Sequence, residues 1–194
     1  MNMIDPIAME ETIVMQHNSD PVSTQYRERR EHTIHDFLSR PRIVYSGELA
    51  PGGQIGDVIK IIPFPSALAN QASVKDKLTG FTYMRSSVNV IVTITAPPSI
   101  TGGIRIFTTP VMHEITGKRL TETPMQHSQF KNKLISLASK TPVHFKIPYV
   151  WHEDAINLTD PNHSNFGNLY IVRASASSVS ACTIRVYASF ATKD

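Results

Sequence analysis

The chain has 194 residues, of which 41% are hydrophobic, so it can bury one sizeable core and is expected to form one domain with an appendage. Only 18% of its residues are charged, below the roughly 25% of average soluble domains, which indicates a surface that partners cover. The net charge is +3, and no stripe dense in Lys or Arg marks a dedicated nucleic-acid groove. No apolar run approaches ~20 residues, so no membrane span is expected.

Residues 1–31 are expected to form an N-terminal arm. They mix Met, Asp, Glu, Gln, Ser and Thr without strand alternation, and their six acidic and three basic side chains give this segment a net charge of −3. Such a segment cannot bury enough apolar surface to become ordered alone. We therefore expect the arm to become ordered against another subunit, and residues 32–194 to form the folded domain.

The segment after the arm is expected to begin with a short helical turn at residues 33–38. Pro41 ends that turn, because the residue before a proline is pushed out of the helical region. Residues 42–46 and 57–62 are then expected to form the first two strands, with a Pro-Gly-Gly loop between them.

The middle of the chain is expected to contain a short helix and the longest strand. Apolar residues recur at roughly helical spacing over 66–78, which predicts the helix. Over 83–96 they recur at every second position, which is the side-chain period of a half-buried strand. Residues 104–109 form the next predicted strand, and proline stops both strands.

A second short helix is expected where Phe130, Leu134 and Leu137 sit at positions i, i+4 and i+7 and would form one apolar stripe. Residues 143–149 read as a further strand. The polar stretch 151–166 reads as a loop that hides one short strand. No internal repeat interrupts this order.

The last two strands are expected at residues 167–175 and 182–190. The total is seven clear strands and one hidden strand, with two short helices over the ends of the sandwich. We therefore predict an all-β fold: an eight-stranded antiparallel jelly-roll sandwich of two four-stranded sheets, with an extended N-terminal arm.

Several segments resemble, in their order along the chain, the major capsid subunits of picorna-like RNA viruses (order Picornavirales) of the dicistrovirus, iflavirus and marnavirus types. The resemblance covers about residues 33–190 and rests on the segments 37–41, 78–88, 102–106, 147–150, 167–171 and 184–190. The sequence departs from the family pattern at Ser99-Ile100-Thr101-Gly102-Gly103. It also lacks the Asp-Asp-Phe cleavage signature of some sister subunits, of which His35-Asp36-Phe37 has only a part.

The resemblance implies a structural capsid protein that forms an icosahedral, non-enveloped, pseudo-T=3 shell around an RNA genome. Its partners would be sister jelly-roll subunits in a hetero-oligomeric protomer, present in sixty copies per shell, with weak and non-specific contact to the genomic RNA. A host receptor is implied but not identified. The expected location is the virion, made and assembled in the host cytoplasm.

The residues that could carry chemistry do not form a recognisable set, so no catalytic, cofactor-binding or metal-binding residue is assigned. His32 and His35 lie three positions apart without further ligands nearby, and His127, His152 and His163 are expected to be solvated loop or interface residues. Titration of histidines near pH 6, which would loosen subunit contacts, remains an open alternative. His35, Asp36 and Ser39 lack the elbow motif of a hydrolase triad.

Two single residues and two other protein classes complete the interpretation. Cys182 is expected to be a buried, inert thiol, and as the only cysteine it excludes an internal disulfide. Trp151 could anchor an interface or cap the core.

The alternative function is a cellular β-sandwich binding module, lectin-like or cupin-like, although no His/Glu metal set of a cupin is visible. An enzyme on a β-barrel is disfavoured.

Overall fold

The computed structural model describes residues 33–97, 99–110, 128–139, 141–159, 165–176 and 182–191. The described helices and strands all belong to the unit Ile34–Asp194. The arm expected at 1–31 lies outside the described residues, so the proposed division into arm and domain stays a prediction.

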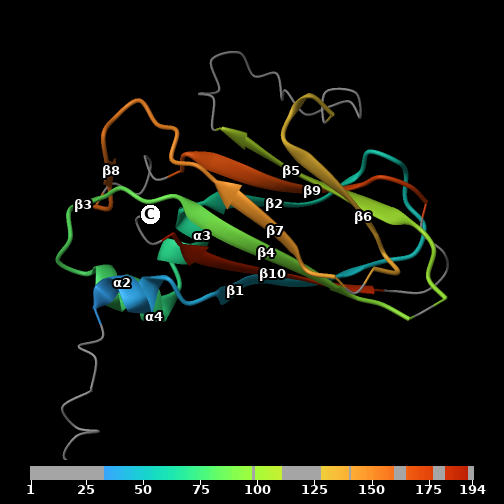
Figure 1. Ribbon diagram of the computed structural model, residues 1–194, viewed down its shortest axis with the longest axis horizontal. Coiled ribbons are helices and arrows are strands. Elements are labelled where there is room, and N and C mark those ends of the chain that lie inside the picture. The colour runs from blue at the N-terminus through green and yellow to red at the C-terminus, as the bar shows by residue number, and fades with distance from the viewer. Residues whose placement is uncertain are drawn as a thin grey trace, which may run out of the picture. The chain divides into compact units, whose positions relative to one another are not determined.

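Eight strands pair into two four-stranded antiparallel sheets (Figure 1). The first sheet has the order β1 (Arg42–Leu49), β10 (Cys182–Phe190), β4 (Val88–Thr95) and β7 (Val143–Ile147). The second has the order β2 (Val58–Phe64), β9 (Gly167–Arg173), β5 (Gly103–Pro110) and β6 (Asn132–Ser136). The first and last strands are neighbours, and so are β2 and β9, which confirms the predicted jelly roll.

The core lies between the two sheets and consists mainly of the inward-facing residues of the strands. Every second residue points to the same face of a strand, so the predicted alternation places one face of each strand in this core. The most deeply buried members are Val88, Val90 and Val92 of β4, Ile104 and Ile106 of β5, Leu169 and Ile171 of β9, and Ile184 and Val186 of β10. Each such side chain contributes roughly 1.5–3 kcal/mol through burial of apolar area.

Three short helices lie near one end of the sandwich (Figure 1). The turn predicted after the arm is α2 (Ile34–Leu38), and the helix predicted over 66–78 is two helices, α3 (Ser66–Ala69) and α4 (Ala72–Leu78). Of the residues predicted at helical spacing, Leu68 and Leu78 are buried, whereas Ala72 is exposed and Val74 is the third buried residue of these helices. None of the helices in the described ranges is long and apolar enough to cross a membrane.

The helix predicted around Phe130, Leu134 and Leu137 is wrong, because residues 132–136 form strand β6. This strand pairs with β5 from Gly103 opposite Ser136 to Phe107 opposite Asn132. Residues four positions apart, such as Phe130 and Leu134, are also compatible with one side of an extended chain. Leu134 faces out and is 67% exposed, whereas Ile135 and Leu137 face the core. Pairing with β5 therefore overrides the local spacing and supplies the eighth strand.

The long strand predicted at 83–96 is interrupted. It consists of β3 (Tyr83–Met84) and β4, separated by Arg85, Ser86 and Ser87. The hydroxyl of Ser86 donates to the carbonyl oxygen of Ala191 at 3.3 Å, which ties the interruption to the end of β10. The short strand predicted within 151–166 is present as β8 (Ile156–Asn157), but it pairs with β3 in a separate two-stranded ladder.

Candidate functional site

The outer face of the β2-β9-β5-β6 sheet carries a second layer of apolar side chains. Ile106 faces the core, so its neighbour Phe107 points to the opposite face of the sheet. The ring of Phe107 stacks on Tyr170 of β9 at 5.0 Å between centroids and on Phe130 at 5.8 Å. Phe107 is fully buried by this arrangement, although it lies outside the core between the sheets.

Exposed aliphatic side chains flank this aromatic stack on both edge strands. Val58 and Ile61 of β2 are 44% and 37% exposed, and Ile61 pairs with Tyr170 across the strands. Leu134 of β6 is exposed at the other edge. We call these residues the outer stripe: Val58, Ile61, Phe107, Phe130, Leu134 and Tyr170. Apolar surface that extends across a whole sheet is typical of a face that another molecule covers.

The outer face of the other sheet is more polar but not free of apolar residues. Its exposed or half-exposed positions on β4, β10 and β7 include Asn89, Thr93, Thr183, Arg185, His144 and Lys146. A cross-strand row of Ile43, Tyr187 and Ile91 lies on the same face, and Ile43 is 51% exposed. The two faces therefore differ in degree, and only the outer stripe contains a stack of aromatic rings.

A cleft of about 580 Å³ is lined by residues of α2, the segment 85–87 and the ends of β7 and β10. Its apolar lining comes from Leu38, Pro148, Tyr149, Phe190 and Ala191. Its polar lining comes from His35, Arg85, Ser86, Ser87 and Lys146. None of these described lining residues carries a carboxylate, so the cleft combines an apolar wall with basic groups.

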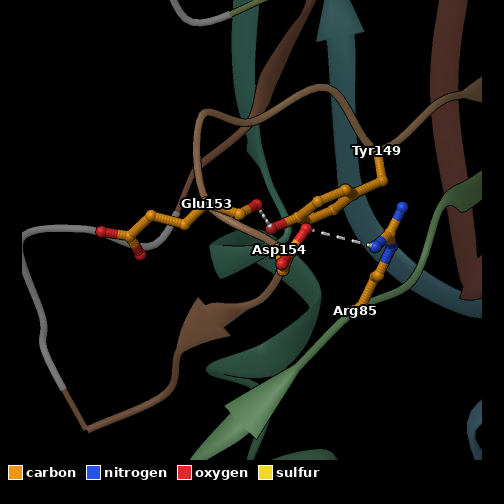
Figure 2. A network of polar contacts seen from close by, with 4 residues as sticks. All are labelled: Arg85, Tyr149, Glu153 and Asp154. Atoms are coloured by element: carbon orange, nitrogen blue, oxygen red, sulfur yellow. Dashed lines mark hydrogen bonds and ion pairs between the residues drawn. The ribbon is translucent and has the colours of Figure 1, made fainter.

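Figure 2 shows how one wall of the cleft is fixed around Tyr149. The Tyr149 hydroxyl donates to the main-chain oxygen of Glu153 at 2.8 Å, and the guanidinium of Arg85 lies 5.5 Å from the centre of the Tyr149 ring. Arg85 also lies 3.8 Å from the carboxylate of Asp154. The ring of Phe166 packs edge-on against the ring of Tyr149, with 5.3 Å between the two centroids, and also holds the Tyr149 ring in place.

The electrostatic surroundings of Tyr149 are mixed. Partial burial raises the pKa of its phenol, the nearby Arg85 charge lowers it, and the carboxylates of Glu153 and Asp154 raise it again. The net direction is upward, so the phenol stays neutral and remains a hydrogen-bond donor to Glu153.

The structure places the histidines, the suspected triad and Cys182 in separate surroundings. His35 lines the cleft, but the hydroxyl of Ser39 donates to the main-chain oxygen of Asp36 at 3.1 Å. That geometry does not present Ser39 to an imidazole.

Cys182 is 3% exposed, which confirms the buried thiol, and burial raises its pKa against the smaller opposing effect of Arg173.

The remaining sequence candidates are loop or edge residues. His152 lies 3.6 Å from Glu153 and against the ring of Trp151, whose centroid is 4.7 Å away. Trp151 is half-buried against the core, which fits a residue that caps the sandwich. His32, His127 and His163 lie outside the described residues. Within those ranges no cluster of three or more His, Cys, Asp or Glu side chains could hold a metal.

Neither the outer stripe nor the cleft was predicted from the sequence. The run Ile104-Arg105-Ile106-Phe107 contains a signal for the stripe, because two adjacent apolar residues in a strand must face opposite sides. The cleft draws its residues from four segments that are far apart in the chain, and no local pattern reveals it. The expectation of no catalytic, cofactor or metal site stays a prediction.

Comparison with known proteins matches residues 18–174 to the family described as picornavirus capsid protein. The structural polyprotein of Cricket paralysis virus is 28% identical over 158 residues, which are 78% of this chain. The chain spans only 18% of the length of that polyprotein.

Solved structures share the fold. A chain in the structure of black queen cell virus has a TM-score of 0.77 at 19% identity, with 98% of this chain and 82% of that chain covered. A chain in the Triatoma virus empty capsid has a TM-score of 0.76 at 22% identity, with 82% and 92% covered. The family consists of viral capsid proteins, which are structural and not enzymes. With its two four-stranded jelly-roll sheets and a family match over most of its length, the chain belongs to the picornavirus capsid protein family.

Proposed function

We propose that this capsid protein forms, with sister jelly-roll subunits, a pseudo-T=3 icosahedral and non-enveloped shell that encloses an RNA genome. Each protomer would contain three related subunits, and sixty protomers would complete the shell. Assembly would take place in the host cytoplasm. The single observation that carries the proposal is the outer stripe, which leaves apolar side chains of both edge strands exposed on one sheet.

The physical argument concerns what covers that stripe. An antiparallel sheet with one solvated face normally has mostly polar residues there, and the outer face of the β1-β10-β4-β7 sheet comes closer to this pattern, with Ile43 as its exposed apolar residue. Leu134 at 67% exposure and Val58 at 44% would be dry only beside another molecule. A sister subunit supplies such a surface, and its contact removes apolar area from water without any chemical step.

The N-terminal arm has a place in the same proposal. Residues 1–31 contain scattered Ile, Val and Met side chains but no strand alternation, so contact with neighbouring subunits would order them. Deletion of residues 1–31 should leave the folded domain intact and impair particle formation. Normal particle yield from that deletion would contradict the role assigned to the arm.

Co-expression with the sister subunits tests the shell itself. The chain should sediment with its partners as particles hundreds of ångströms across, visible by electron microscopy. A chain that remains a small monomer in the presence of its sister subunits would contradict the proposal. It would favour the alternative of a β-sandwich binding module.

A further inference from the structure

We propose that the cleft at the α2 end of the sandwich binds one nucleotide unit of single-stranded RNA. The phosphate would lie against Arg85 and Lys146, and the base would lie on the platform that Arg85 forms with Tyr149. This inference rests on the proposed shell around an RNA genome. It goes further because it names the residues and the kind of contact.

The first argument is the charge of the lining. Arg85, Lys146 and His35 reach the cleft from three different elements, namely the segment before β4, the strand β7 and the helix α2. All three are exposed, and none of the described lining residues is acidic. Arginine and lysine are the side chains that bind phosphate in nucleic-acid complexes, arginine through its planar fork and lysine as a point charge.

The ion pair between Arg85 and Asp154 does not block this use. The two groups are 3.8 Å apart, and their side chains are 66% and 107% exposed. Pairs so open to water are weak and are screened by salt. A phosphate would therefore displace Asp154 from the guanidinium, and Lys146, which already makes a contact of its own, would exchange that contact for the phosphate.

The second argument is the planar platform. The guanidinium of Arg85 lies over the ring of Tyr149. Figure 2 shows the hydrogen bond from the Tyr149 hydroxyl to Glu153, which holds the ring in place. Phe166 packs edge-on against the same ring. Bases that are not paired stack on aromatic rings and on guanidinium planes, whatever their sequence. Leu38 and Pro148 add apolar wall beside the platform.

The third argument is that the cleft is formed before any ligand arrives. The amide of Ala191 donates to the carbonyl oxygen of Ser87 at 2.8 Å, so the end of β10 is fastened to the segment before β4. The hydroxyl of Ser86 bridges the same two segments. A volume of about 580 Å³ is in the usual range for small-ligand sites and accepts a single nucleotide unit.

A single site with two or three basic groups reads no sequence, because nothing in the lining pairs with base edges in a fixed pattern. We therefore expect binding that is weak, tolerant of sequence and sensitive to salt. An acidic peptide would satisfy the basic groups but would not use the platform. This difference separates the two kinds of ligand by experiment.

The experiment measures fluorescence anisotropy of a labelled eight-nucleotide oligouridylate with the full chain at low salt. Arg85→Gln with Lys146→Gln should weaken binding by tenfold or more and reduce the slope of log K against log salt by about 0.7, for the one phosphate that is no longer neutralised. The matched control is Lys131→Gln with Arg185→Gln, which removes the same charge from exposed positions outside the cleft. It should change affinity by less than twofold. An equal loss in both double variants would overturn the site, because only net charge would matter.

Tyr149 variants test the platform. Tyr149→Phe keeps the ring and should retain binding, whereas Tyr149→Leu should weaken it by roughly fivefold or more, as loss of base stacking does. Thermal melts of both variants verify that the domain remains folded. Equal binding by the Phe and Leu variants would overturn the stacking role and with it the nucleotide assignment.

Competitors identify the source of the ligand. Uridine monophosphate should displace the oligomer only at far higher concentration, because the strand makes further contacts; equal potency would overturn the assignment to RNA in favour of a free nucleotide. A synthetic peptide of residues 1–26, which has four carboxylates and no Lys or Arg, should not compete. Its tighter binding at the cleft would overturn the assignment in favour of an acidic segment.

The two levels of the argument fail in different ways. If particles form normally but the cleft variants bind the oligomer like the parent chain, the nucleotide site is wrong and the proposed shell stands. If the parent chain forms no particles with its sister subunits, the proposed function is wrong whatever the cleft binds.

Discussion

On their outer faces the two sheets of the sandwich differ in chemistry. The β1-β10-β4-β7 sheet presents mainly Thr, Asn, Arg, His and Lys side chains beside the row of Ile43, Tyr187 and Ile91, whereas the β2-β9-β5-β6 sheet presents the outer stripe with its stack of aromatic rings. The inner faces of both sheets are uniformly apolar and share one core. Burial of apolar residues between the sheets thus explains why the chain folds. The difference in chemistry between the two outer faces indicates which face a neighbouring subunit covers.

The largest effect should come from charge placed on the outer stripe. Leu134→Asp combined with Ile61→Asp should reduce particle yield by at least tenfold, because an interface would then bury two unpaired carboxylates. The isolated domain should lose little stability, since both side chains are partly or largely exposed. Particle yield is measured by sedimentation of the co-expressed subunits.

Asn89→Asp is the control for that pair, because it adds a carboxylate to the exposed outer face of β4 in the other sheet. It should leave particle yield close to that of the parent chain. If Asn89→Asp impairs assembly as much as the stripe variants do, the two outer faces are equivalent and the comparison fails.

The aromatic stack should contribute to folding as strongly as a core residue does. Phe107→Ala should lower the free energy of unfolding by about 3–5 kcal/mol, because it removes a fully buried ring from between Tyr170 and Phe130. Phe145→Ala, on the inner face of β7, should cost a similar amount. Urea denaturation measures both, and a cost below about 1 kcal/mol for Phe107→Ala would show that the stack is not a second packed layer.

The inner faces of the two sheets should respond alike to a small cavity. Ile171→Val in β9 and Ile184→Val in β10 should each cost about 0.5–1.5 kcal/mol, since both side chains are fully buried in the same core. Urea midpoints at constant slope give the two values. A difference above about 1 kcal/mol would mean that one sheet packs more loosely than the other.

The smallest effect concerns Cys182 on the inner face of β10. Burial raises its pKa, so the folded thiol stays protonated at pH values where the unfolded thiol ionises near about 8.5. Its contribution to stability is fully present below that pH and is lost as pH rises through the higher folded pKa. Alkylation by iodoacetamide at pH 8 should be much slower in the native chain than in urea. Similar rates in both states would contradict a dry inner face.

The sequence predicted most of the fold because period-two hydrophobicity is a local signal. The strand β10 follows it along its whole length and has the predicted bounds, and β4 follows it except at Ile91, although β4 begins five residues after the predicted start. The strand β6 did not, because Phe130 and Leu134 are spaced equally well for a helix. Its register comes from pairing with β5, which is more than twenty residues away in the chain.

The candidate sites could be predicted less well than the fold. The stripe could be predicted only by knowing which side of β5 faces the core. Phe107 is assigned to the outer face because its neighbour Ile106 lies in the core. The cleft depends on the ends of β7 and β10 reaching α2 at one place. Both features are properties of tertiary contact, whereas the family resemblance could be found from short motifs in order along the chain.

The most direct test is an electron cryomicroscopy map of particles assembled from this chain and its sister subunits. The account predicts that a neighbouring subunit covers Leu134, Ile61 and Val58 on the outer face of the β2-β9-β5-β6 sheet. A map in which these side chains face solvent, while the polar outer face of the other sheet forms the main contact, would contradict it.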